Sequence, residues 1–175
     1  MPSLSLCLLL DEQADQAVRR LWRQLEDDGL PSLTGHTHGR HVPHLTLASL
    51  GNASVDEVRD AVAGLPEARP EPVTFAALGS FTRSRCSLVP AVSAELMSRH
   101  ERVAAALVAA GTRVHRHYLP GAWLPHLTLA TRSQAETLPQ IARRVYEVLP
   151  LTAVLERAAV VDTSSGEVHR LQRLV

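Results

Sequence analysis

The sequence predicts an α+β fold: a duplicated, two-lobed arrangement of two small, mostly antiparallel sheets around a central cleft, with helices outside and pseudo-two-fold symmetry. Two observations carry this prediction. The hexapeptide at residues 43–48 recurs unchanged at residues 125–130, an offset of 82 positions. Strand-like and helix-like patterns also alternate in the same order on both sides of the middle of the chain. We therefore expect one domain over residues 1–175, with repeat one at about 1–82 and repeat two at about 83–175.

The first repeat has the predicted order strand, helix, strand, helix, strand. Serine and leucine alternate before Asp11, which predicts a strand. Apolar residues recur on one face of the next segment, and Gly29 is suited to end that helix. Ser54 and Glu57 form a capping box that opens a short helix. The expected elements are a strand at 3–10, a helix at 11–28, strands at 44–50 and 73–81, and a short helix from Ser54 that ends before Pro66.

The second repeat has the same predicted order, with one strand added at its end. Ser93 is a helix cap, and Gly111 is suited to end that helix. The next helix begins at Ser133 or at Thr137, and Pro139 favours Thr137 because proline is tolerated in the first turn of a helix. The expected elements are strands at 86–92, 126–130, 151–161 and 168–174, the last two forming a hairpin around 164–166, and helices at 93–110 and after Thr137.

The composition excludes several classes of enzyme. All 18 basic residues are arginine, so the chain cannot carry a nucleotide on a lysine, use a P-loop lysine or form a Schiff base. The apolar run at 4–10 is too short to span a membrane. Cys7 and Cys86 give no disulfide framework, which favours a reducing compartment. We expect a soluble, cytoplasmic protein with no membrane association and no obligatory protein partner.

Charge is unevenly distributed although the formal net charge is zero. No acidic residue occurs between Asp28 and Asp56, and none occurs between Glu101 and Glu136. An anion bound by these two stretches would meet no repelling carboxylate there. Chance is the alternative explanation for gaps of this length, so the pattern alone does not assign an anion site.

The repeated motif brings together groups that suit phosphate chemistry. On a strand, residues i and i+2 point to the same face, so His44 projects beside Thr46 and His126 beside Thr128. A neutral imidazole can take a proton from an attacking hydroxyl, and a protonated one can give a proton to the leaving oxygen. The threonine hydroxyls can hold the non-bridging oxygens of a phosphate. Core packing would preserve the leucines of a duplicated strand but gives no reason for a second outward-facing histidine.

Two His-Leu-Thr-Leu strands about 80 residues apart resemble the two-histidine (2H) phosphoesterase superfamily, and most of all its bacterial 2′-5′ RNA ligase and cyclic phosphodiesterase branch. The resemblance covers nearly the whole chain. It implies that His44 and His126 are the acid and base, and that Thr46 and Thr128 bind the phosphate. It also implies hydrolysis of 2′,3′-cyclic phosphates of nucleotides or RNA, or reversible 2′-5′ RNA ligation, without ATP, metal or another cofactor. In many relatives an arginine directly follows the second motif strand, whereas here Thr131 precedes Arg132.

Long loops precede both motif strands, at 30–42 and 112–124, and carry further candidates. Their arginines can add positive charge to a phosphate pocket or can lie in solvent. Their aromatic residues can stack on a base; for Trp123, packing of the loop onto the core is the alternative. Phe81 can line the cleft or lie in the core. The substrate-binding candidates are Arg40, Arg116, Tyr118, Trp123 and Arg132.

Two other functions stay open from the sequence. The same cleft could bind a nucleotide or an RNA end without turnover. The histidines at 36, 38, 41 and 44, with those at 115 and 117, could bind a metal. Their spacing matches no established zinc pattern and no cysteine or acid joins them, so we predict no metal site.

Overall fold

The computed structural model describes residues 4–81 and 85–175, and its elements follow the order expected from the two halves of the chain. The helices are α1 (Glu12–Asp27), α2 (Val55–Ala63), α3 (Ala94–Ala109) and α4 (Leu138–Tyr146), with short 3-10 helices η1 (Arg116–Tyr118) and η2 (Ala135–Thr137). The strands are β1 (Leu4–Leu10), β2 (His44–Gly51), β3 (Glu71–Phe81), β4 (Arg85–Pro90), β5 (Arg113–Val114), β6 (Leu127–Thr131), β7 (Leu151–Asp162) and β8 (Val168–Arg170).

The predicted helix ends are confirmed by their capping contacts. The Asp11 side chain accepts a hydrogen bond from the backbone of Ala14 at the start of α1. Gly29 follows that helix with a φ of +72°, a conformation that favours glycine. Ser54 and Glu57 form both bonds of the predicted capping box of α2. Helix α4 begins after Thr137, the later of the two starts that the sequence left open.

The strands form one eight-stranded sheet, so the prediction of two separate small sheets is wrong. The path is β5-β2-β1-β7-β3-β4-β6, with β8 paired to β7, and every pair is antiparallel. The cause lies in the two longest strands. Strand β7 pairs along one part with β1 and along residues 151–155 with β3, while β3 continues beyond that overlap beside β4. The two expected groups of strands are present, but they are joined through the ends of β3 and β7.

The strand order is symmetric about the β7–β3 pair. On one side lie β1 and β2, and on the other lie β4 and β6, so both motif strands occupy matching places. A register shift occurs between Leu6 and Cys7 opposite β2, and an equivalent shift occurs between Cys86 and Ser87 opposite β6. The origin of this arrangement in a duplication stays a prediction.

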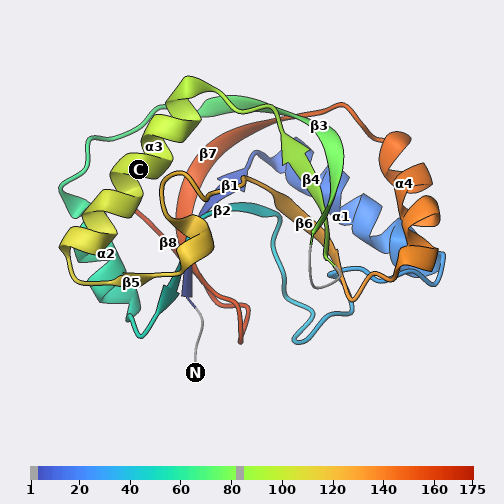
Figure 1. Ribbon diagram of the computed structural model, residues 1–175, viewed down its shortest axis with the longest axis horizontal. Coiled ribbons are helices and arrows are strands. Elements are labelled where there is room, and N and C mark those ends of the chain that lie inside the picture. The colour runs from blue at the N-terminus through green and yellow to red at the C-terminus, as the bar shows by residue number, and fades with distance from the viewer. Residues whose placement is uncertain (1–3, 82–84) are drawn as a thin grey trace.

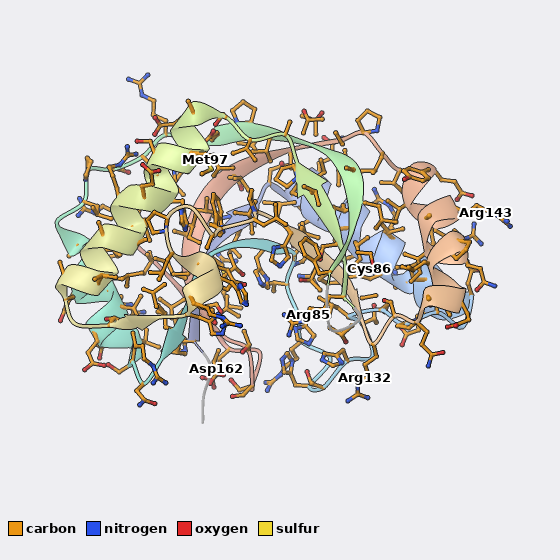
Figure 2. All side chains as sticks on the ribbon, viewed as in Figure 1. Arg85, Cys86, Met97, Arg132, Arg143 and Asp162 are labelled. Atoms are coloured by element: carbon orange, nitrogen blue, oxygen red, sulfur yellow. The ribbon has the colours of Figure 1, made fainter. Side chains whose placement is uncertain are left out.

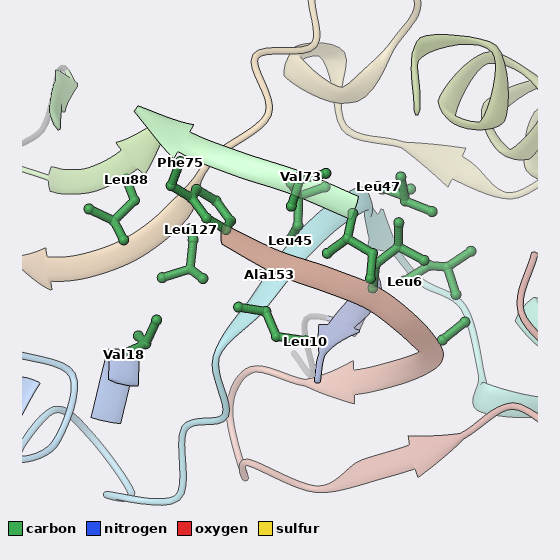
Figure 3. Close-up of a cluster of buried hydrophobic side chains, with 14 of the residues drawn as sticks. Leu6, Leu10, Val18, Leu45, Leu47, Val73, Phe75, Leu88, Leu127 and Ala153 are labelled. Atoms are coloured by element: carbon green, nitrogen blue, oxygen red, sulfur yellow. The ribbon is translucent and has the colours of Figure 1, made fainter. Parts of the chain in front are cut away.

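Helices pack in pairs at the two ends of the sheet. Helix α2 lies against α3 and α1 against α4, and Figure 1 shows these pairs at opposite ends with the strands between them. The buried apolar side chains come from both halves, among them Leu6, Leu45, Phe75 and Leu127 (Figure 3). Because Leu45 and Leu127 point into this core, the histidine and threonine on either side of each leucine face the other way.

Two details differ from the sequence prediction. The loop expected at 112–124 contains β5, which pairs with Leu50 and Gly51 of β2, and the short helix η1. The last strand stops at Arg170 and does not continue to Leu174. The backbone of Leu174 bonds instead to Ala68, and its side chain is buried, so packing takes the chain away from the sheet edge.

Candidate active site

The two motif strands contact each other although four strands separate them along the sheet. The sheet therefore curls far enough to bring β2 and β6 together. Positive charge on His44 contributes to lowering the pKa of His126, so the two rings lie within electrostatic range of each other. Both side chains are half-buried. The structure thus brings the two predicted catalytic histidines to one site.

Both histidine rings are held in the same way. The Nδ1 atom of His44 lies 2.7 Å from the carbonyl oxygen of Val42, and Nδ1 of His126 lies 2.7 Å from that of Leu124. A carbonyl oxygen can only accept, so each Nδ1 carries the hydrogen and donates. In the neutral ring Nε2 then has the lone pair and can take a proton, and in the protonated ring Nε2 can give one.

The environment keeps both rings neutral more readily than water does. Desolvation lowers the pKa of His44, and its bond to the Val42 carbonyl partly opposes this. Desolvation also lowers the pKa of His126, with further lowering by the positive charges of Arg85 and His44. A bound phosphate would supply the negative charge that favours protonation of one ring.

The motif threonines are fixed through their backbone carbonyls. The indole nitrogen of Trp123 donates to the carbonyl of Thr46 at 3.0 Å, and that of Trp22 donates to the carbonyl of Thr128 at 3.3 Å. Both tryptophans are buried. Each register shift lies opposite one of these threonines, and tryptophans from other segments satisfy the carbonyls there.

The hydroxyl of Thr46 lies beside two polar side chains, Cys7 and Tyr118. It is 3.7 Å from the Cys7 sulfur and forms a hydrogen bond with the Tyr118 side chain. Burial raises the pKa of Cys7 to about 12, so the thiol stays protonated. Burial also raises the pKa of Tyr118, which keeps its hydroxyl as a donor. Opposite Thr128, the Ser87 hydroxyl occupies the place of Cys7 and is buried without a hydrogen-bond partner among the described residues.

The predicted substrate-binding residues do not all reach this site. Tyr118 does, through Thr46. The Trp123 ring stacks on the buried His100 with centroids 4.0 Å apart, so its role is the packing one of the two alternatives. Arg40 donates to the carbonyl of Ser165 in the loop between β7 and β8. The other two candidates, Arg116 on η1 and Arg132 after β6, are exposed.

The sequence did not point to Arg85, and it allowed Phe81 either in the cleft wall or in the core. Arg85 is exposed at the first position of β4, one residue before the strand start that the sequence predicted. Its positive charge lowers the pKa of His126, after the larger effect of burial, so the guanidinium lies within electrostatic reach of that ring. The Phe81 ring lies 4.9 Å from that of His126 and forms part of the site wall. Arg85 could be recognised only from the register of β4 with β6, because that pairing places it beside Thr131.

The loop at 30–42 contributes a stack of histidines. The His38 and His41 ring centroids are 4.2 Å apart, and those of His36 and His41 are 5.7 Å apart. Across residues 4–81 and 85–175, no group of three or more histidine, cysteine or acidic residues has the geometry to hold a metal. No helix within those ranges is long and apolar enough to cross a membrane.

Comparisons with solved structures show the same fold. An E. coli LigT structure complexed with 3′-AMP is 19% identical, with a TM-score of 0.62, and the match covers 98% of this chain and 95% of that one. A phosphoesterase crystal structure, also 19% identical, has a TM-score of 0.64 over 98% and 96% of the two chains. Kluyveromyces marxianus Usb1 is 16% identical, with a TM-score of 0.53 over 97% and 98%.

Comparisons of the sequence itself give two results. A search of the curated proteins finds no match. The family model described as the 2′-5′ RNA ligase superfamily matches residues 10–167, which includes both motif strands and most of each half. The resemblance to the two-histidine phosphoesterases is thereby confirmed. On its sequence and its fold, this chain belongs to the 2′-5′ RNA ligase superfamily.

Proposed function

We propose that this protein is a metal-independent phosphoesterase that opens 2′,3′-cyclic phosphates at nucleotide or RNA ends. The observation that carries the proposal is the equivalent setting of His44 and His126. Each ring is fixed by Nδ1 to the carbonyl two residues earlier, on strands that contact each other. Membership of the 2′-5′ RNA ligase superfamily supports a phosphoesterase role. E. coli LigT structures in complex with 3′-AMP and with phosphate support a nucleotide substrate.

The proposed reaction needs two proton transfers. One neutral histidine takes a proton from water through Nε2 while the water oxygen forms a bond to phosphorus. The bond from phosphorus to the 3′ oxygen breaks, and the other, protonated histidine gives its Nε2 proton to that oxygen. The product is a 2′-phosphate with a free 3′ hydroxyl. Thr46 and Thr128 donate to the non-bridging oxygens, where negative charge increases in the transition state.

The same steps allow ligation when the attacking group is changed. A 5′ hydroxyl of a second RNA would replace water and give its proton to the neutral histidine. The bond to the 3′ oxygen again breaks, which leaves a 2′-5′ linkage and consumes no ATP. Which attacking group prevails depends on what occupies the cleft beside the cyclic phosphate.

The test is hydrolysis of adenosine 2′,3′-cyclic phosphate with identification of the product. Replacing either motif histidine, in His44→Ala and His126→Ala, should lower kcat by at least ~10²-fold, the usual contribution of acid–base catalysis. His169→Ala, on β8 outside the motif strands, is the matched control and should retain the parental rate. Equal melting temperatures of the variants would show that the fold is intact. Parental rates in both motif variants would refute the mechanism, and binding without product would favour the non-catalytic alternative.

A further inference from the structure

Three side chains form a second group at the far end of β6, which we name the cationic track: Arg85, Arg132 and His36. Arg85 lies in register with Thr131, the last residue of β6, and Arg132 follows that strand directly. Nδ1 of His36 is 3.1 Å from the Thr131 hydroxyl. The loop at 30–42 and two strands of the second half therefore place these three side chains together.

The positive charge of the cationic track is not neutralised. Neither Arg85 nor Arg132 forms an ion pair with any residue in the described part of the chain, and both are exposed. By contrast, Arg144 on α4 is paired with two carboxylates. After desolvation, the charges of Arg132 and Arg85 help to lower the pKa of His36. Unpaired guanidiniums that act on the same ring make a favourable place for an anion.

The backbone at Arg132 is strained. Its φ of +63° lies in the left-handed region, which glycine adopts readily and other residues rarely do. Such conformations persist where the surroundings fix them, and they cluster at ligand sites. The chain therefore places a charged side chain at a position where glycine would fold more easily.

The cationic track lies some distance along the chain from His126, and its Arg85 is within electrostatic reach of that ring. Thr131 lies five positions after His126, a distance of about 16 Å at the usual rise of a strand. Arg85 spans part of this interval, because its charge acts on both His126 and His36. Successive nucleotides of a stacked strand rise by about 3.4 Å, so about 16 Å suits a short oligonucleotide and exceeds one nucleotide.

We infer that the cationic track binds a backbone phosphate of an RNA chain whose cyclic phosphate end lies between His44 and His126. The inference rests on the proposed function and narrows its substrate class to oligonucleotides. Guanidinium groups bind phosphate oxygens in pairs of hydrogen bonds, and the flat rings of the His36–His41 stack can contact a base beside that phosphate. A mononucleotide would occupy the reacting site and leave the cationic track empty.

The test compares two substrates with the same reacting end: adenosine 2′,3′-cyclic phosphate and a hexanucleotide that ends in adenosine 2′,3′-cyclic phosphate. The parental protein should have a kcat/KM at least ~10-fold higher for the hexanucleotide, and added salt should reduce this preference. Arg132→Gly should remove most of the preference without lowering Tm, because glycine relieves the backbone strain. Arg143→Gln is the matched control, since Arg143 is an exposed arginine on α4, well away from Arg85 and Arg132 in Figure 2.

The outcomes separate the inference from the proposed function. Equal kcat/KM values of the parental protein for the two substrates would overturn the inference and leave the phosphoesterase proposal standing. So would an Arg132→Gly variant that loses the same factor on both substrates, because Arg132 would then act at the reacting phosphate. Turnover of neither substrate would overturn the proposed function and the inference with it.

Discussion

Acidification should destabilise the folded protein, and His41 is the residue through which the effect can be measured. The pKa of His41 is lowered from 6.5 to about 4, first by burial and then by the neighbouring rings of His38 and His36. In the unfolded chain the ring returns to its ordinary pKa. Below pH 6.5 the unfolded state therefore binds more protons than the folded state, and stability is lost as the pH falls.

The size of this loss follows from the shift. At about pH 5 the unfolded ring is almost fully protonated and the folded ring almost fully neutral, which costs about 2 kcal/mol relative to neutral pH. A domain of this length loses about 2–4 °C of Tm for each kcal/mol. His41 alone should therefore lower Tm by about 4–8 °C between about pH 7.5 and about pH 5.

The assay is urea unfolding at both pH values for the parental protein and for His41→Asn. Asparagine is polar but does not titrate, so subtracting the two pH dependences cancels the contributions of the other histidines and the carboxylates. The parental protein should lose about 2 kcal/mol more than the variant. If both proteins lose the same free energy on acidification, the surroundings of His41 do not hold its ring neutral, which would refute this prediction.

Four further predictions concern the site and its support. Because both motif histidines have lowered pKa values, the state with one protonated ring is populated below pH 6.5, so the bell-shaped profile of kcat/KM should have its optimum there. Thr46→Val should lower kcat by about 10²-fold and Thr46→Ser much less, since serine restores the hydroxyl donor. Trp123→Phe should lower the free energy of unfolding by about 1–3 kcal/mol, measured in urea, by leaving the Thr46 carbonyl unpaired. EDTA treatment should leave the rate of hydrolysis unchanged.

Local patterns were enough to predict most of the elements. Alternating residues, caps and glycine stops are short-range signals, and the capping box at Ser54 and the glycine stop at Gly29 are confirmed. The single sheet was not predictable in this way. It depends on which strands pair, and the five-residue overlap of β3 with β7 joins segments about 80 residues apart. Nothing in either strand's own sequence specifies that partner.

In the candidate site too, residues marked by local sequence could be predicted, whereas residues that matter through strand pairing could not. The sequence singled out His44 and His126 because a repeated polar pair on a strand has no packing explanation, and the structure brings the two together. Arg85 could not be found, because its relevance comes from lying beside Thr131 on a neighbouring strand. The sequence left both stacking on a base and packing on the core open for Trp123, and its burial against His100 separates these roles.

The third strand of each half pairs with the first strand of the other half, since β3 lies beside β4 and β7 lies beside β1. The halves are interlocked, so a cut between them would not release two independent folding units. An ancestor with a single repeat could build the same sheet only as a homodimer whose subunits exchange these strands. Its two identical histidines would then have met across the molecular dyad. Fusing the copies into one polypeptide would have allowed each motif histidine to acquire different neighbours, as Arg85 now acts on His126 and not on His44.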